Sequence, residues 1–185
     1  MKLFARTAIY ISFLLCVAAC KKDNKHFIRI EGFDLFDPSG VPIGHVGAAD
    51  NDWTFNNTLS QDELDLFDFL PSDVNFNNTV EATIAGNRIN PYPNPVNFLQ
   101  GYSMNASDSV VMKVVWVNSH LEVLTRTALK FKGSKGFQVN LSDRSIYRNN
   151  AEIRMYFSFS ALNKPNFKAG YGDVKICDNP DNCHF

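Results

Sequence analysis

The stretch EIRMYFSF, residues 152–159, decides the fold class, because polar and apolar side chains alternate along it. Such an alternation is typical of a β-strand with one buried face. It predicts a strand whose buried face carries Ile153, Met155, Phe157 and Phe159. A second stretch, VVMKVVWV at residues 110–117, is apolar on both faces. We expect it to be a central strand of the same sheet.

Four further stretches of strand-like composition lie in the second half of the chain: VNFLQGYSM, HLEVLTRTALKF, FQVNL and GYGDVKIC. Asn, Ser, Gly and Lys residues separate them. Short strands at close spacing are typical of an antiparallel sandwich. The sequence therefore predicts a mainly β protein, with six short strands forming an antiparallel β-sandwich over residues 86–185.

Residues 27–85 predict a smaller region with a β-hairpin and one helix. The turn residues DPSG, at positions 37–40, separate two short alternating stretches. Further on, Ser60 and Glu63 have the spacing of a capping box, at the start of a helix that Pro71 ends. The buried face of that helix would carry Leu64, Phe67 and Leu70.

The segment NPYPNPVNFLQ, residues 90–100, contains the pattern Tyr-Pro-Asn-Pro. It resembles the entry of the C-terminal sorting domain of type IX secretion cargo in Bacteroidota, and that resemblance implies an Ig-like sandwich. The chain has SHLEV at residues 119–123 and AEIR at residues 151–154, where the family usually has a hairpin glycine and a Gly-x-Tyr. We therefore expect a related Ig-like β-sandwich without sorting activity. Type IX secretion cargo is the alternative.

The first 19 residues have the features of a secretory signal peptide, because Lys2 and Arg6 precede an apolar run at residues 8–19. The run is too short to span a bilayer. Its end, VAAC at residues 17–20, resembles the lipobox of bacterial lipoproteins. The resemblance implies that the signal is removed before Cys20, that diacylglycerol is joined to the Cys20 sulfur, and that the new amino terminus is acylated, for example with palmitate.

Residues 20–26 would then be a lipidated tether. Two or more acyl chains hold a protein firmly in a membrane. Lys21 after the cysteine favours export to the outer membrane, and Lys22-Asp23 partly matches the short signal that sends Bacteroidota lipoproteins to the cell surface. We expect a lipid anchor in the outer membrane, with the protein on the cell surface rather than on the periplasmic face.

The two cysteines near the C-terminus, Cys177 and Cys183, predict a disulfide. Cysteine pairs in exported proteins are commonly bridged, and the residues between these two, DNPDN, are turn-forming. A metal site with His184 as a third ligand is one alternative, although Cys-x5-Cys-His is not a recognised zinc spacing. Free thiols are the other.

Charge and motifs argue against several classes of function. Loss of Lys2 and Arg6 with the signal changes the formal net charge from −1 to −3, and the longest basic run is Lys21-Lys22, so nucleic acid binding is disfavoured. The histidines are scattered, and no hydrolase, zinc-protease or phosphate-loop motif is present. We therefore expect no enzyme activity, no catalytic residues and no cofactor other than the lipid on Cys20.

The candidate calcium ligands are four aspartates, because calcium takes carboxylates on loops. They are Asp34, Asp37, Asp50 and Asp52. Trp53 beside them could stack on a sugar. The preferred interpretation is that the aspartates are turn residues flanking strands and that Trp53 belongs to the core, so no metal site is predicted.

Together these features favour a lipid-anchored interaction module, a non-catalytic accessory subunit of an envelope or surface complex with an outer-membrane protein as its partner. A surface binding protein for a glycan or another nutrient is the alternative, and it would expose Trp53 or Trp116 beside polar residues. An enzyme without a recognisable motif would show a cleft with converging carboxylates.

Overall fold

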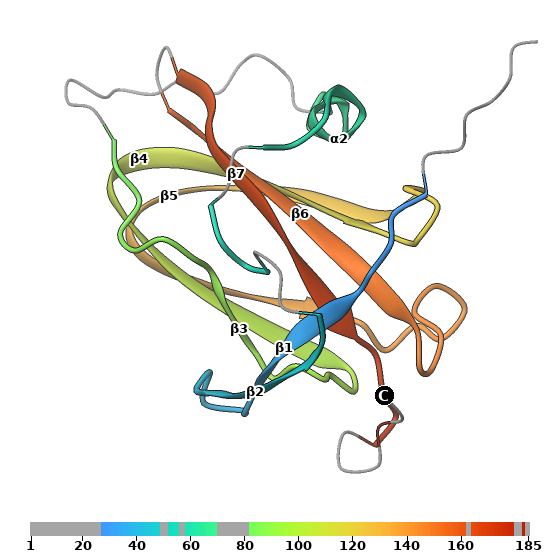
Figure 1. The fold of residues 1–185 in the computed structure, drawn as a ribbon. Helices are drawn as coiled ribbons and strands as arrows, with labels where there is room; N and C mark the ends of the chain where they lie inside the picture. The colour runs from blue at the N-terminus through green and yellow to red at the C-terminus, as the bar shows by residue number, and fades with distance from the viewer. Residues whose placement is uncertain are drawn as a thin grey trace, which may run out of the picture.

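The computed structural model of the protein describes residues 27–48, 52–55, 58–69, 82–161, 164–179 and 183. The predicted signal peptide at residues 1–19, the tether at residues 20–26 with Cys20, and Asp50 all lie outside the described residues. Within the described residues, the regular elements are seven strands and one short helix (Figure 1). Their bounds are Gly32–Phe36 (β1), Pro42–Gly47 (β2), Gln61–Asp65 (α2), Asn90–Tyr92 (β3), Leu99–Val117 (β4), Val123–Asn140 (β5), Glu152–Ala161 (β6) and Lys164–Lys175 (β7).

β4 is the central strand of the large antiparallel sheet. It pairs with β5 on one side along most of its length, and on the other side with β3 near its start and β6 near its end. β7 extends the sheet beyond β6, while β1 and β2 form a separate hairpin. The predictions of a central strand at residues 110–117 and of an N-terminal hairpin are confirmed.

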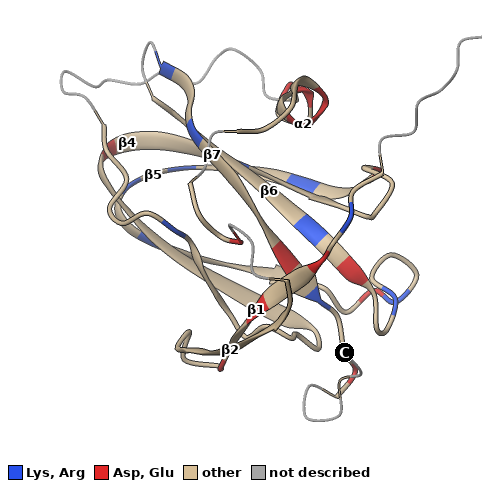
Figure 2. Cartoon of the chain, viewed as in Figure 1, with Lys and Arg blue, Asp and Glu red and all other residues tan. Residues whose placement is uncertain are grey.

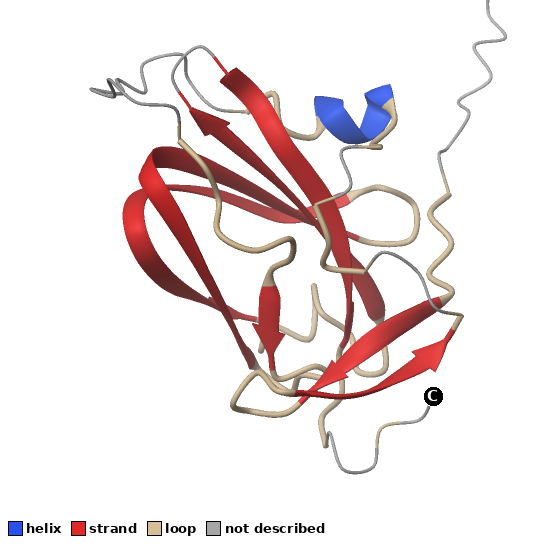
Figure 3. Cartoon of the chain, turned by 60° about the vertical axis from the view of Figure 1, so that its left-hand side comes forward, coloured by secondary structure: helices blue, strands red, loops and turns tan. Residues whose placement is uncertain are grey.

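β4 and β5 bend together, so that one curled sheet supplies two facing layers (Figures 1 and 3). The register between the two strands is interrupted between Ala106 and Val110, and an interruption of this kind bends a strand pair. One layer holds β3 with the start of β4, and the other holds the end of β4 with β6 and β7. The predicted fold class is confirmed: the protein is mainly β, antiparallel and sandwich-like, with a smaller N-terminal strand and helix region.

The strands are fewer and longer than predicted. VNFLQGYSM and VVMKVVWV both lie largely in β4, and HLEVLTRTALKF and FQVNL both lie largely in β5. The polar residues between these stretches are typical of turns, yet the two strands are paired on both sides of the interruption, with Ala106 opposite Gly133 and Val110 opposite Phe131. Gly133 has a φ of +72°, a conformation that glycine adopts without steric cost.

The space between the two layers holds the main core. All four apolar residues predicted for the inner face of β6 are buried there. The N-terminal region adds Phe36, Trp53, Ala82 and Ile84 to the same core. Residues on both sides of position 86 therefore share one core.

α2 begins with the predicted capping box. The Ser60 N–H donates to Glu63 Oε2 at 2.7 Å, and the Glu63 N–H donates to Ser60 Oγ at 3.4 Å. Glu63 Oε1 also accepts a hydrogen bond from the hydroxyl of Tyr156 on β6, at 2.5 Å. The cap therefore fixes the start of the helix and also ties it to the sheet.

The helix ends at Asp65, earlier than predicted. Phe67, in the turn that follows, is fully buried against the outer face of the sheet. The Phe67 carbonyl accepts a hydrogen bond from Lys113 Nζ of β4 at 2.7 Å. A side chain of the sheet therefore satisfies this carbonyl in place of a further helical turn. Leu70 and Pro71 lie outside the described residues.

Candidate functional site

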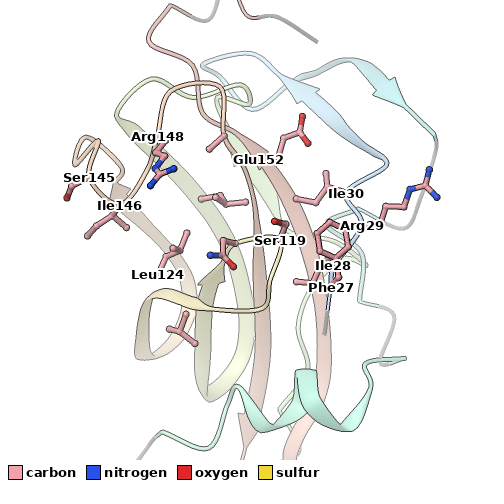
Figure 4. Close-up of a pocket in the computed structure, with 14 residues that line it drawn as sticks. Phe27, Ile28, Arg29, Ile30, Ser119, Leu124, Ser145, Ile146, Arg148 and Glu152 are labelled. Atoms are coloured by element: carbon pink, nitrogen blue, oxygen red, sulfur yellow. The ribbon is translucent and has the colours of Figure 1, made fainter. Parts of the chain in front are cut away.

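Three segments from distant parts of the sequence enclose an open groove with a volume of about 780 Å³. They are residues 27–30, the turn after β4 together with the start of β5 at residues 118–124, and the loop before β6 together with the start of β6 at residues 145–153. In Figure 4, Phe27, Ile28 and Ile30 form one wall, while Leu124 and Ile146 lie on the opposite wall. We call this site the apolar groove.

Large apolar side chains are exposed in this groove. Phe27 is 63% exposed, Val123 is 46% exposed and Ile146 is 42% exposed. Single exposed apolar residues are common on proteins, but several that gather in one concave site mark an interaction surface. The groove is therefore the described site with the clearest signature of binding.

The wall at residues 27–30 is fixed to the sheet. The Ile28 N–H donates to the Ser119 carbonyl at 2.8 Å, and the Ile28 side chain is buried in the outer core. The neighbouring Phe27 ring instead meets the His120 ring edge-on, with 5.7 Å between centroids. Phe27 is thus held in place while most of its surface faces solvent.

The turn at residues 118–122 is built without glycine. Asn118 Oδ1 accepts hydrogen bonds from the His120 N–H at 2.9 Å and the Glu122 N–H at 3.1 Å. Leu121 has a φ of +59°, in the left-handed region that usually favours glycine. The Asn118 side chain therefore supports a tight turn at a place where the sequence has no glycine.

Arg144 holds the opposite wall, because its guanidinium binds three separate segments. Nη1 donates to the Leu141 carbonyl at 2.8 Å, and Nη2 donates to the Asn97 carbonyl at 2.7 Å. Nε donates to Asp178 Oδ1 at 2.7 Å. These contacts fix the loop that carries Ile146 and connect it to the chain beyond β7.

The C-terminal cysteines agree with the predicted disulfide. Cys177 and Cys183 are paired, with their Cα atoms 5.7 Å apart. Cys177 is buried, and its N–H donates to the Val96 carbonyl at 2.8 Å. The alternative metal ligand His184 lies outside the described residues. The pair adjoins Asp178, so it lies next to the contact that supports the Arg144 wall.

The rim of the groove carries charges of both signs. Arg29 pairs with Glu31 at 3.2 Å, and Glu152 pairs with Lys175 at 3.1 Å. Arg148 lies in the wall near Ile146 (Figure 4). A rim of mixed charge favours a largely apolar binding partner over a highly charged one.

The candidate calcium ligands that the structure describes have other roles. Asp37 Oδ1 accepts hydrogen bonds from the N–H groups of Ser39 and Val41 in the hairpin turn, and the Ser39 hydroxyl lowers the Asp37 pKa. Asp34 pairs with Arg88 Nη2 at 2.9 Å and with His45 Nδ1 at 3.0 Å. Among the residues that the structure describes, no three His, Cys, Asp or Glu side chains gather as a metal site would require.

Asp52 belongs to a buried set of hydrogen bonds that we call the polar clasp: Asp52, Asn94, Arg154 and Asp173. Asp52 Oδ1 accepts from the Asp173 N–H at 2.6 Å, and Oδ2 accepts from the Asp34 N–H at 3.2 Å. Asn94 Nδ2 donates to the Asp173 carbonyl at 2.9 Å. These contacts join the N-terminal region to β7.

The charged pair of the polar clasp lies on the outer face of β6 and β7. Arg154 Nε and Nη2 donate to the two carboxylate oxygens of Asp173, both at 2.7 Å. Burial alone would lower the Arg154 pKa, but the hydrogen bonds and charge of Asp173 raise it above its usual range. The Arg154 guanidinium carbon lies 3.9 Å from the centroid of the Tyr171 ring. Arg154 thus stays charged although its side chain is almost completely buried.

The two tryptophans are core residues. Trp53 is completely buried and Trp116 is 1% exposed, and both belong to the main core. The preferred interpretation of Trp53 is confirmed. Neither ring offers a flat exposed surface on which a sugar could stack.

The apolar groove itself was not predicted, because its walls are distant in the sequence. One signal could have indicated it. Ile146 is the one aliphatic residue in the polar loop SDRSIYRNN, although a single apolar residue in a loop does not by itself mark a binding site.

Comparisons of the chain with protein-family models, with curated proteins and with solved structures found no match. Over the described ranges, no helix has both the length and the apolar character needed to cross a bilayer.

Proposed function

We propose that this protein is a lipid-anchored, non-catalytic interaction module of the outer membrane, and that the apolar groove binds an exposed segment of a membrane protein. The observation that carries the proposal is the exposure of Phe27, Val123 and Ile146 in one concave site. Burying such side chains on a partner is favourable, because apolar surface leaves water.

The position of the groove along the chain supports a partner in the same membrane. Phe27 follows the proposed lipidation site Cys20 by seven residues. Seven residues span at most about 25 Å, whatever their conformation. A protein anchored through Cys20 would therefore keep the groove within that distance of the lipid surface, where the outer parts of membrane proteins lie.

The chemistry of the groove indicates what kind of segment would bind. Its walls offer the apolar side chains of Phe27 and Ile146, and the polar residues Asn118 and Ser119 also line it. An apolar side chain on a loop would fill the space between the walls. Such an occupant avoids the cost of burying an unpaired charge.

The glycan-binding alternative gains no support from the tryptophans, because Trp53 and Trp116 are both buried. The described carboxylates of the former calcium candidates are engaged with backbone N–H groups or cations. We therefore give preference to the interaction module.

The binding site is tested by purifying the tagged full-length protein from membranes in a mild detergent. We compare the native protein with Ile146→Asp and with Ile43→Asp, because Ile43 is another exposed isoleucine, 63% exposed against 42% for Ile146, and does not line the groove. We expect a stoichiometric outer-membrane protein to accompany the native chain and the Ile43 variant, and to be lost from the Ile146 variant. Identical co-purifying proteins in all three samples would contradict the groove as the binding site.

The anchor is tested separately with Cys20→Ser. We expect this variant to leave the membrane fraction after a carbonate wash, because it lacks the sulfur to which the lipid is joined. A variant that stays wholly membrane-bound would contradict lipidation at Cys20 while leaving the groove experiment valid.

A further inference from the structure

The elements around the apolar groove carry charges of both signs, and these charges are of two kinds (Figure 2). Arg29 pairs with Glu31, and Glu152 pairs with Lys175, so these charges are balanced within the chain. Arg148 also lines the groove, but within the described residues it forms no ion pair with an acidic side chain. Among the described residues that line the groove, Arg148 therefore offers a positive charge that the chain itself does not neutralise.

The backbone that carries Arg148 is held on both sides. Tyr147, which precedes it, is buried. Asn149, which follows it, accepts the N–H of Asp178 on Oδ1 at 2.9 Å. The Arg148 side chain therefore starts from a fixed point close to Ile146. A fixed starting point reduces the entropy that is lost when a partner pairs with the side chain.

Arg148 and Ile146 lie on the same wall of the groove, and both are exposed (Figure 4). Arg29 lies on the opposite wall, and Figure 4 shows its side chain extending away from the groove. Consecutive Cα atoms of a chain are about 3.8 Å apart. A partner residue that fills the space beside Ile146 would therefore bring its neighbours in the sequence close to Arg148.

The charge of Arg148 discriminates between these neighbours. A lysine or arginine beside the apolar residue would be repelled, and a neutral residue would gain nothing from the charge. A carboxylate would instead accept charge-assisted hydrogen bonds from the guanidinium. Because Arg148 is exposed, this pairing avoids the large cost of burying two ions and contributes to selectivity more than to affinity.

We propose that the apolar groove selects a partner loop in which an aspartate or glutamate directly neighbours the apolar residue that fills the groove, and that Arg148 is the specificity-determining residue. This inference rests on the proposed function, because it names the segment that the same site binds. The apolar residue supplies most of the affinity, and the carboxylate decides among apolar loops that would otherwise fit equally well.

The test uses the purified full-length protein in detergent and three fluorescent peptides of equal length. Each peptide places one leucine in a glycine-serine background, with aspartate, asparagine or lysine beside the leucine, and binding is followed by anisotropy. We expect the aspartate peptide to bind about threefold more tightly than the asparagine peptide, and the lysine peptide to bind most weakly. High salt should remove these differences, because it screens an exposed ion pair.

Variants locate the selectivity. Arg148→Glu should reverse the order of the aspartate and lysine peptides, because the charge beside Ile146 is inverted, whereas Arg148→Lys should keep the order. Arg126→Glu is the matched control, because Arg126 is an exposed arginine that does not line the groove, and it should leave the order unchanged. Ile146→Asp tests the groove itself and should abolish binding of the neutral asparagine peptide.

The outcomes separate this inference from the proposed function. Equal binding of the three peptides that is lost in the Ile146 variant would overturn the selection of an acidic neighbour and leave the groove as a binding site. The same change of order in Arg148→Glu and Arg126→Glu would overturn the role of Arg148. Absence of binding, or binding that Ile146→Asp does not change, would contradict the groove and with it both proposals.

Discussion

The polar clasp and the apolar groove depart from the usual distribution of side chains in opposite ways. The clasp buries charged side chains, and the groove exposes apolar ones. In the clasp, the charged groups of Arg154 and Asp173 are buried and are joined to each other by two hydrogen bonds. In the groove, Phe27 and Ile146 are exposed although a core lies close by. The buried and hydrogen-bonded pair stabilises the fold, whereas we propose that the exposed apolar cluster binds a partner, so the two regions should respond oppositely to mutation.

The largest expected effect is the loss of stability on Asp173→Ala. The Arg154 charge would stay buried without its carboxylate, and removing one member of such a pair typically costs about 3–5 kcal/mol. Urea unfolding measures the change. Asp178→Ala is the control, because the Asp178 pair with Arg144 is partly exposed and should cost much less. Equal losses of stability in the two variants would mean that the Arg154–Asp173 pair does not stabilise the fold more than the Arg144–Asp178 pair does.

Arg144→Ala should have an intermediate effect that links the two regions. It removes hydrogen bonds from a charged group to the Leu141 and Asn97 carbonyls, each worth on the order of 1 kcal/mol or more. We expect a loss of about 2 kcal/mol together with weaker partner binding, because the wall that carries Ile146 loosens. Amide hydrogen exchange in residues 141–148 checks this directly, and unchanged exchange there would contradict the role of Arg144 as the support of the wall.

Glu63 should give a smaller, pH-dependent effect. Burial alone would raise its pKa, but hydrogen bonds from Tyr156 and Ser60 outweigh burial and lower the pKa from its ordinary value of 4.5. A lowered folded-state pKa means that the contribution to stability is present above pH 4.5 and is lost as the pH falls through the folded-state pKa. The stability difference between native protein and Glu63→Gln, measured by unfolding, should therefore shrink below pH 4.5. A difference that stays constant with pH would show that the charge of Glu63 is not involved.

The smallest effect on stability is expected in the groove. Ile146→Asp replaces an exposed side chain, and such substitutions usually change the free energy of unfolding by no more than about 0.5 kcal/mol. Thermal unfolding of the purified variant measures it. A loss of stability comparable with that of Asp173→Ala would show that Ile146 belongs to the core. It would contradict the interpretation of the groove as a binding site.

The parts of the fold that the sequence predicts are those set by neighbouring residues. The capping box of Ser60 and Glu63 lies within four residues, and the inner face of β6 follows from a simple alternation. The length of β4 was missed, because the polar residues between Ala106 and Val110 resemble a turn, and only the pairing with β5 before and after them shows that the strand continues.

The polar clasp and the apolar groove depend on contacts between distant residues, which the sequence alone does not reveal. Asp52 reads as a turn residue or a metal ligand, but it accepts the N–H of Asp173, 121 residues away. Phe27 and Ile146 face each other from opposite walls of the groove only because the sheet brings residues 27–30 close to the loop before β6. Local patterns carry no information about either arrangement.

The most direct measurement of the central claim is site-specific photo-cross-linking in intact cells that produce the full-length protein. A photoreactive residue is placed at Ile146 or, as the matched control, at Ile43, and cross-linked species are identified in the outer-membrane fraction. We predict a single discrete adduct with one outer-membrane protein from position 146, its loss when Val123→Asp is added, and no such adduct from position 43. The same adducts from both positions, or none from position 146, would contradict the groove as the site of partner binding.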